Sequence, residues 1–216
     1  MQNLFHAADE NTVAPAMTSF DPDGLSHAEQ YKLLAGSIVP RPIALVTTLG
    51  TSGPNAAPFS FFNMLSVEPP MLMFSVGMRA GEDKDTIRNL REVPEMVVHL
   101  VDQANAEGMN LCSGPYPPDV NELELAGFKT LKAECVRPPR IAACPVHFEC
   151  VLEQIQPFGK VPYKLVIARV LRMHFRSDIV STAYHVDSRA LDAIGRITGP
   201  GMYARLTDSF QLKSLL

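Results

Sequence analysis

IALVTTLGTSGPNAAPFSFFNMLSVEPPMLMFSV, residues 43–76, is the stretch that decides the fold. It contains three extended runs, at 43–49, 56–66 and 71–76, and the turn residues 50–55 separate the first two. Runs of β-branched and aromatic residues bounded by Gly, Pro and Asn are typical of strands joined by short connections. The stretch therefore predicts consecutive antiparallel strands.

The remaining chain adds further strands and several short helices. Apolar or alternating runs lie at residues 96–101, 146–155 and 163–175, and 156–162 supplies the hairpin loop between the last two. Short helices are expected at 26–34, 84–90, 104–112, 121–126 and in the tail 188–216, with Ser26 and Asp85 as N-caps of the first two. Because strands come in runs with helices inserted between them, we predict a mainly β barrel with helical additions rather than a doubly wound sheet.

Length, charge and composition limit the class of protein. The 216 residues, 46% of them hydrophobic, suit one domain over residues 21–216 after a polar N-terminal arm over 1–20. A formal net charge of −4 argues against nucleic-acid binding, and no apolar run approaches the ~20 residues of a membrane span. Since no Lys or Arg precedes Lys32 and no apolar signal region is present, we expect a cytoplasmic protein.

The four cysteines are too few and too scattered for a disulfide framework. Cys135, Cys144, His147 and Cys150 resemble a zinc set, but they lack the C-x-x-C pair that structural zinc sites favour. If residues 147–152 form a strand, His147 and Cys150 point to opposite faces. We therefore predict free thiols and no metal site.

Pro58 marks an irregular strand with the composition of a ligand site. A proline inside a strand lacks a ladder donor, which predicts an edge strand or a bulge. Around it, Ser60, Asn63 and Ser66 are small polar residues among aromatic ones, a combination that suits a flat heteroaromatic ligand. The alternative is an ordinary core strand with turn-forming polar residues.

Lys84, Asp85 and Thr86 form a second candidate site. A cation beside a helix start, together with a hydroxyl and backbone N–H groups, suits a phosphate, although the same residues also fit plain helix capping. Arg41, fixed between two prolines, fits a phosphate contact, an interface or a solvated turn. The absence of G-x-G-x-x-G, P-loop, G-x-S-x-G and H-E-x-x-H patterns excludes the commonest nucleotide and hydrolase classes.

Several stretches, taken in order, resemble the flavin reductase-like, FMN-binding family. They are residues 31–34, 37–48, 55–70, 84–86 with Asn89, and 195–203. The resemblance covers residues 21–212 and implies a split β-barrel, Greek-key-like and antiparallel, with several short helices. It also implies a homodimer that holds one non-covalent FMN per subunit near the dimer interface, with FAD the less favoured flavin.

The resemblance also indicates where the cofactor lies. It places the flavin ring against residues 60–63 and the strand start 42–44, and the phosphate near Ser60, Lys84 and Thr86. The expected cofactor contacts are Arg41, Pro42, Ile43, Ala44, Ala57, Phe59, Ser60, Phe61, Asn63, Lys84, Asp85, Thr86, Arg196 and Tyr203.

The activity implied by the resemblance is NAD(P)H-dependent reduction of flavin. In such a protein the fold orients flavin and nicotinamide, so we expect no residue to act as a general acid or base. A monooxygenase component is a candidate partner beside the small molecules. Two alternatives stay open, namely a flavoprotein electron carrier fed by another protein and a non-catalytic barrel that binds a partner or ligand.

One position departs from the family pattern. Short flavin reductases often carry a His after the Tyr of a Gly-x-Tyr stretch, where it helps seat the nicotinamide, but Ala204 follows Tyr203 here. His185, from the preceding loop, is the candidate for that nicotinamide contact. The alternatives are a surface or interface role for His185 and a protein that uses pyridine nucleotides poorly.

Overall fold

The structure is a computed structural model that describes residues 15–199 and 201–213. Most of the expected N-terminal arm therefore lies outside the described residues. The helices are η1 (Pro22–Gly24), α1 (His27–Ser37), α2 (Asp85–Glu92), η2 (Gln103–Asn105), α3 (Ala106–Leu111), α4 (Glu122–Leu125) and α5 (Ser188–Leu191). The strands are β1 (Ala44–Gly50), β2 (Gly53–Phe59), β3 (Phe62–Val67), β4 (Pro70–Val76), β5 (Glu95–Leu100), β6 (Thr130–Leu131), β7 (Arg140–Ile141), β8 (Val146–Phe158), β9 (Tyr163–Phe175), β10 (Ile194–Arg196) and β11 (Tyr203–Arg205).

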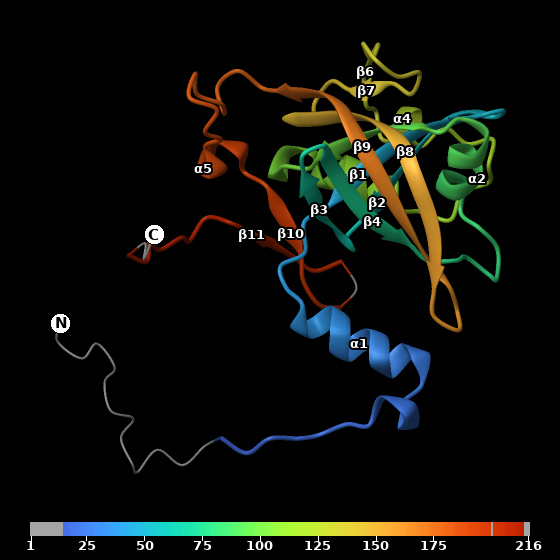
Figure 1. Cartoon of the computed structure of the whole chain (residues 1–216), viewed down its shortest axis with the longest axis vertical. Helices are drawn as coiled ribbons and strands as arrows, with labels where there is room; N and C mark the ends of the chain where they lie inside the picture. Colours follow the sequence, from blue (N-terminus) through green and yellow to red (C-terminus); the bar gives the residue numbers. More distant parts are fainter. Residues whose placement is uncertain (1–14, 200, 214–216) are drawn as a thin grey trace.

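Seven strands form one sheet in the order β2-β1-β5-β8-β9-β4-β3, and every neighbouring pair is antiparallel. The sheet curls around a core, so that Phe59 of β2 and Phe74 of β4 stack with their ring centroids 5.2 Å apart (Figure 1). Two shorter sheets pair β10 with β11 and β6 with β7. The prediction of a mainly β, antiparallel barrel with short helices is confirmed.

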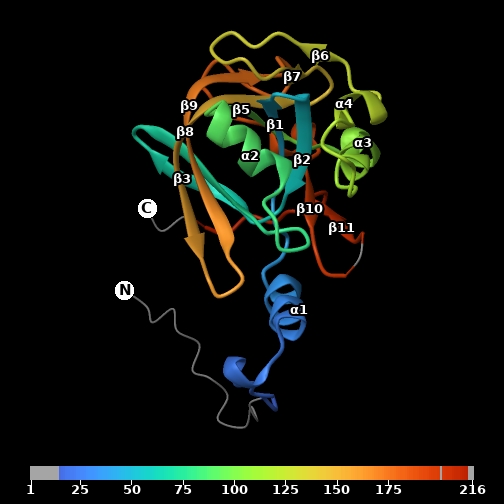
Figure 2. The ribbon, with the colours of Figure 1, turned by 90° about the vertical axis from the view of Figure 1, so that its right-hand side faces the viewer.

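β1 has an apolar core on each of its faces. Ala44 and Val46 point into the barrel, while Ile43 and Leu45 pack in a second cluster with residues of α3 and α4. In Figure 2, α2 lies over the barrel and α3 and α4 lie beside β2. Because both faces of β1 are covered, its sequence is a continuous apolar run rather than an alternating one.

Residues 56–66 were predicted as one extended stretch, and here the prediction is wrong. The stretch is divided into β2 and β3, with Ser60 and Phe61 in a bend between them. β2 and β3 lie at opposite ends of the strand order, so these two residues carry the chain from one edge of the curled sheet to the other. Pro58 lies in edge strand β2, as its missing N–H predicted.

Several boundaries also differ from the sequence prediction, and three of the differences have a clear local cause. β8 continues to Phe158, so the β8–β9 loop is 159–162, where Gly159 has a φ of 84°. Lys84, not Asp85, is the N-cap of α2, and the Asp85 carboxylate instead pairs with Arg88 one turn later. The helix expected at 104–112 is divided into η2 and α3 because the Asp102 side chain accepts a hydrogen bond from Asn105 N and caps a first tight turn.

α1 extends away from the barrel in both views (Figures 1 and 2). Its N-terminus has the expected capping box, since Ser26 Oγ accepts from Glu29 N and the Glu29 carboxylate accepts from Ser26 N. Its C-terminus is held by Arg41, whose Nη1 donates to the carbonyls of Ala35 and Ile38 and whose Nη2 donates to Ile197 O at 3.0 Å. Arg41 thus fixes α1 to the chain just after β10.

Over the described parts of the chain, the helices are all too short or too polar to cross a membrane.

Candidate functional site

Three neighbouring cavities form a groove along the end of β2. The largest, about 390 Å³, is lined by Ile43, Pro58, Phe59, Ser60 and Tyr203, among others. A second, of about 260 Å³, shares Pro58, Phe59 and Ser60 and adds Lys84. A third, of about 70 Å³, contains Lys84, Asp85 and Thr86 beside Ala57 and Pro58. Since Pro58 lines all three, a single elongated ligand can occupy the groove.

The Lys84 end of the groove holds two cationic side chains and is partly desolvated. Burial, and then the positive charge of Arg79, lower the pKa of the Lys84 ammonium. The structure gives Lys84 no ion pair within residues 15–199 and 201–213, and its Nζ lies 5.7 Å from the centroid of the Phe59 ring. Arg79 lines the same small cavity, and its Nη2 donates to Gly114 O. Asp85 and Glu122 line this cavity too, but the Asp85 carboxylate pairs with Arg88 and the Glu122 carboxylate accepts from Asn55 and Ala56. The two cations therefore have no carboxylate partner of their own among the described residues, which favours an anion here.

Thr86 supplies a buried hydroxyl at this end. It is 1% exposed, and its Oγ1 has no hydrogen-bond partner among the described residues. A buried polar atom without a partner costs free energy. A hydroxyl of this kind beside two cations therefore indicates that a ligand oxygen accepts its hydrogen bond.

Glu122 of α4 lines the smallest of the three cavities and holds β2 in place. Its carboxylate accepts from Asn55 Nδ2 at 2.7 Å and from Ala56 N at 3.2 Å. Burial raises the pKa of this carboxyl above its ordinary value, although the hydrogen bonds from backbone N–H groups and from Asn55 oppose the shift. The contact fixes the backbone just before Ala57 and Pro58. Sequence reasoning missed Glu122, because the contact joins residues more than sixty positions apart.

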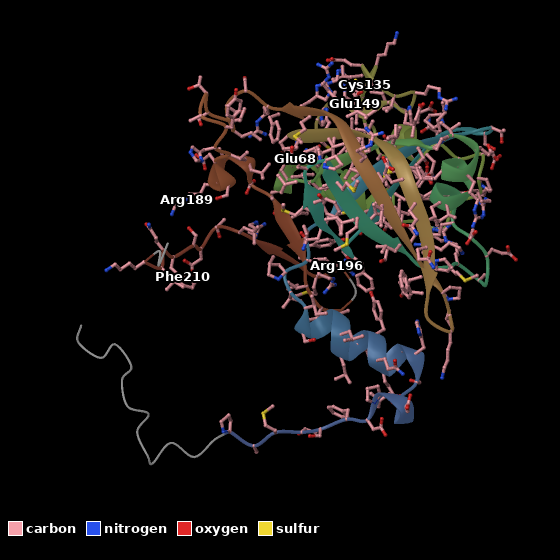
Figure 3. The ribbon with its side chains drawn as sticks, viewed as in Figure 1. Glu68, Cys135, Glu149, Arg189, Arg196 and Phe210 are labelled. Carbon is pink, nitrogen blue, oxygen red and sulfur yellow. The ribbon has the colours of Figure 1, made fainter. Side chains whose placement is uncertain are left out.

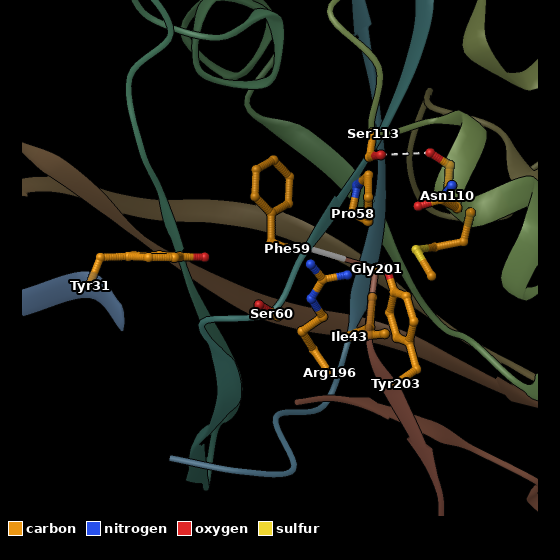
Figure 4. Close-up of a pocket in the computed structure, with 11 residues that line it drawn as sticks. Tyr31, Ile43, Pro58, Phe59, Ser60, Asn110, Ser113, Arg196, Gly201 and Tyr203 are labelled. Atoms are coloured by element: carbon orange, nitrogen blue, oxygen red, sulfur yellow. Dashed lines mark hydrogen bonds between the residues drawn. The ribbon is translucent and has the colours of Figure 1, made fainter. Parts of the chain in front are cut away.

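The opposite wall of the largest cavity comes from the end of the chain and from α1. The guanidinium of Arg196 lies 4.7 Å from the centroid of the Tyr203 ring. Tyr31 reaches in from α1, with its hydroxyl directed toward Ser60 (Figure 4). Asn110 and Ser113 close the far side, where Ser113 Oγ donates to Asn110 O at 2.6 Å. Tyr31, Asn110 and Ser113 were not singled out from sequence, because only the tertiary fold brings them to β2.

The structure gathers most of the expected cofactor contacts around this groove. The groove itself is lined by Ile43, Ala57, Phe59, Ser60, Phe61, Lys84, Asp85, Thr86, Arg196 and Tyr203. Arg41 lies near it, but the residue is only 6% exposed, and its guanidinium donates to backbone carbonyls, with Ser60 Oγ 3.5 Å from its Nε. In this structure Arg41 anchors α1, a contact that the sequence analysis did not consider.

Four expected contacts lie outside the groove. Pro42 is exposed, and Ala44 is fully buried in the barrel core. Asn63 lies on exposed edge strand β3, where its Oδ1 accepts from Met64 N. His185 lies in an exposed loop whose ends, Val180 and Val186, form a bridge.

The residues considered for zinc do not converge. Cys150 packs in the barrel core, Cys144 packs in the second core and Cys135 is exposed. His147 Nε2 lies 2.8 Å from Cys144 O, so this ring is engaged with the backbone. Figure 3 shows Cys135 beside Glu149, whose carboxylate accepts the backbone N–H groups of Glu134 and Cys135.

Comparison with known proteins identifies the family. The model of the flavin reductase like domain matches residues 36–194, most of the chain. The protein belongs to this family.

Solved structures agree with this assignment. Nitrilotriacetate monooxygenase component B from Bacillus cereus is 36% identical, with a TM-score of 0.88 over 92% of this chain and 100% of that one. The 2-nitrobenzoate 2-nitroreductase NbaA from Pseudomonas fluorescens is 35% identical, with a TM-score of 0.83 over 91% and 96%. A Shewanella frigidimarina protein named for its split barrel domain is 17% identical, with a TM-score of 0.79 over 92% and 100%, and shares the fold. The expected split β-barrel is confirmed.

Proposed function

We propose that the protein binds FMN in the β2 groove and reduces it with NAD(P)H. The observation that carries the proposal is the Lys84 end, where a desolvated ammonium, Arg79 and the unpartnered Thr86 hydroxyl surround one small cavity. An anionic group with several acceptor oxygens, such as a phosphate, satisfies all three. The adjoining larger cavity then receives the ring.

The walls of that cavity suit a flat heteroaromatic ring. Pro58 and Phe59 supply apolar cover from β2, and Ile43 supplies it from the start of β1. Ser60 Oγ and the side chains of Asn110 and Ser113 provide donors and acceptors for a ring edge. These residues orient the ring and exclude water from its faces.

Bound FMN would supply the redox chemistry by accepting a hydride from nicotinamide. The chain's own contribution is positioning and electrostatics. Arg196, held over Tyr203, places a positive charge beside the ring cavity and would stabilise negative charge that develops there. No side chain is assigned as a general acid or base.

The proposal is limited to the reductive half of the reaction. The two solved structures of similar identity are a monooxygenase component and a nitroreductase, which differ in what finally receives electrons. A monooxygenase component remains the proposed partner, on the similarity of this chain to a protein that is itself one component of a monooxygenase.

We also propose a homodimer, supported by the apolar side chains that the single chain leaves exposed. On β3, Met64 is 62% and Val67 is 75% exposed, and Met173 of β9 is 47% exposed. Burying such side chains against a second copy removes apolar surface from water. An interface at β3 would also bring Asn63 next to the partner. The cytoplasmic location stays a prediction, for cell fractionation to test.

The absorbance spectrum of the purified protein after FMN is added and excess is removed tests the cofactor assignment. We expect retained flavin absorbance, followed by bleaching when NADH or NADPH is added without oxygen. Retained flavin that neither nucleotide bleaches would contradict the reductase and favour the protein-fed electron carrier. A colourless protein would contradict flavin binding and favour the non-catalytic barrel.

A further inference from the structure

A large cavity of about 920 Å³ lies between α1 and the barrel. α1 supplies His27, Tyr31 and Lys32, and the barrel side supplies Arg41, Tyr163 and Arg196. Tyr31 and Arg196 also line the ring cavity of the groove, so the two cavities adjoin each other. The volume falls in the upper part of the range for sites that hold a whole small molecule.

Aromatic rings form one side of this cavity. The His27 and Tyr163 rings face each other with centroids 6.4 Å apart and an interplanar angle of 28°. Tyr163 stacks in turn on Phe61, 5.7 Å away. Such a surface recognises a flat heterocycle by stacking, as aromatic side chains recognise nucleobases.

The charged groups lining the cavity are cationic. Lys32, Arg41 and Arg196 line it, and no Asp or Glu of the described chain does. Glu29, one turn before Lys32, does not line the cavity, and its carboxylate accepts from Ser26 N and Ser26 Oγ at the helix start. Arg41 donates to backbone carbonyls, and Arg196 Nη2 donates to Gly199 O. Lys32 and the remaining N–H groups of Arg196 are therefore the donors that can meet a ligand.

We propose that this cavity binds the adenylate half of the nicotinamide dinucleotide and favours the 2′-phosphate of NADPH over the 2′-hydroxyl of NADH. The inference rests on the proposed function, because it assigns the donor of that reaction. In doubly wound dinucleotide-binding folds, sites that select NADH place a carboxylate at the ribose 2′-hydroxyl, whereas sites for NADPH place a cation there. The same charge argument holds for a site in another fold, because the 2′-phosphate is anionic in both. The charged side chains that line this cavity are cations, as in sites for NADPH.

Calorimetric titration of the FMN-loaded protein with 2′,5′-ADP and with AMP tests the proposal. We expect 2′,5′-ADP to bind at least tenfold more tightly than AMP. Lys32→Glu should lower this ratio at least fivefold by placing a like charge beside the 2′-phosphate. His27→Ala should weaken both ligands by a similar factor because it removes a stacking ring. Lys129→Ala, which removes an exposed charge beside β6, is the matched control and should change neither affinity.

Equal affinities for the two ligands, or a ratio unchanged by Lys32→Glu, would overturn the assignment. Displacement of bound FAD by 2′,5′-ADP, without competition against NADPH, would also overturn it and assign the cavity to the adenylate of FAD. The titrations can also be made on protein without flavin. A protein that binds 2′,5′-ADP but never FMN would therefore contradict the proposed function while still supporting an adenylate site in this cavity.

Discussion

At the scale of single residues, the proposed phosphate end of the groove depends on Lys84 and Thr86. Lys84 is desolvated beside Arg79 before any ligand arrives, and Thr86 holds a buried hydroxyl without a described partner. Both features cost the folded chain some stability and are relieved by the same anion. At this end of β2, the protein without ligand is therefore less stable than it could be, and the proposed anion binds more tightly as a result.

Replacement of Lys84 by Ala should weaken FMN binding about ten- to hundredfold, since a charge-assisted hydrogen bond contributes about 1.5–3 kcal/mol. Riboflavin, which lacks the phosphate, should keep its affinity. Fluorescence titration with both flavins measures the difference. Equal losses for the two flavins would mean that Lys84 supports the fold rather than the phosphate.

Thr86→Val should have opposite effects on stability and binding. Valine has the same shape and removes the unpartnered hydroxyl, so the protein without flavin should unfold at the same or a higher urea concentration. FMN affinity should fall about threefold to tenfold, corresponding to one hydrogen bond of about 0.5–1.5 kcal/mol. A clear loss of stability in the flavin-free variant would show that the hydroxyl already has a partner.

At the scale of elements, three neighbouring strands each contribute one histidine to a row of rings. These are His99 of β5, His147 of β8 and His174 of β9. His99 of β5 lies between β1 and β7, with its Nδ1 2.9 Å from Leu45 O and its Nε2 accepting from Ile141 N. Its ring centroid is 5.0 Å from that of His147 on β8. Burial, with the nearby His147 and Arg140 charges, lowers the pKa of His99 to about 3. The ring is therefore a neutral link among strands.

This histidine should make the fold sensitive to acid. Unfolding returns His99 to a pKa near 6.5, so below that pH the unfolded chain binds a proton that the folded chain excludes. The free energy of unfolding should fall by about 1.4 kcal/mol per pH unit below 6.5, or about 2 kcal/mol by pH 5. Urea unfolding at pH 7.5, 6 and 5 measures this slope.

The control for the acid effect is His185→Gln, which changes an exposed ring and should leave the slope as it is. His147, whose pKa burial also lowers, should add to the slope. Stability that stays constant from pH 7.5 to 5 would contradict a neutral, excluded His99.

Most helices and strands were predictable from the sequence, but some of their boundaries were not. The apolar run of β1 and the alternation of β9 follow from which faces the barrel buries. The break at Ser60 and Phe61 does not appear in the local pattern, because it results from β2 and β3 lying at opposite edges of the sheet. Likewise Lys84 and Ser60 could be selected from sequence, whereas Tyr31 enters the site only through the tertiary position of α1.

At the scale of the whole molecule, the single chain leaves apolar side chains of β3 and β9 in solvent. Light scattering at micromolar concentration should give about twice the chain mass of 23.7 kDa. Met64→Glu combined with Val67→Glu should shift the mass toward one chain, because desolvating carboxylates opposes association. The same variant should bind FMN more weakly if the partner completes the site near Asn63.

Wild-type protein that stays monomeric and binds FMN as tightly as proposed would contradict the dimer. A double variant that remains dimeric would move the interface away from β3. Circular dichroism of the variant, which should match the wild type, separates loss of association from loss of folding.

The two-residue link at Ser60 and Phe61 has a consequence for how this chain tolerates change. Surface connections usually accept extra residues at little cost, and 159–162 is such a connection. The link at 60–61 joins both edges of the barrel and also lines the groove. One inserted residue there would shift the register of β3 against β4 or move Phe59 and Ser60 along the ligand. We therefore expect an insertion at the two-residue link 60–61 to be tolerated much less well than an insertion in the loop 159–162.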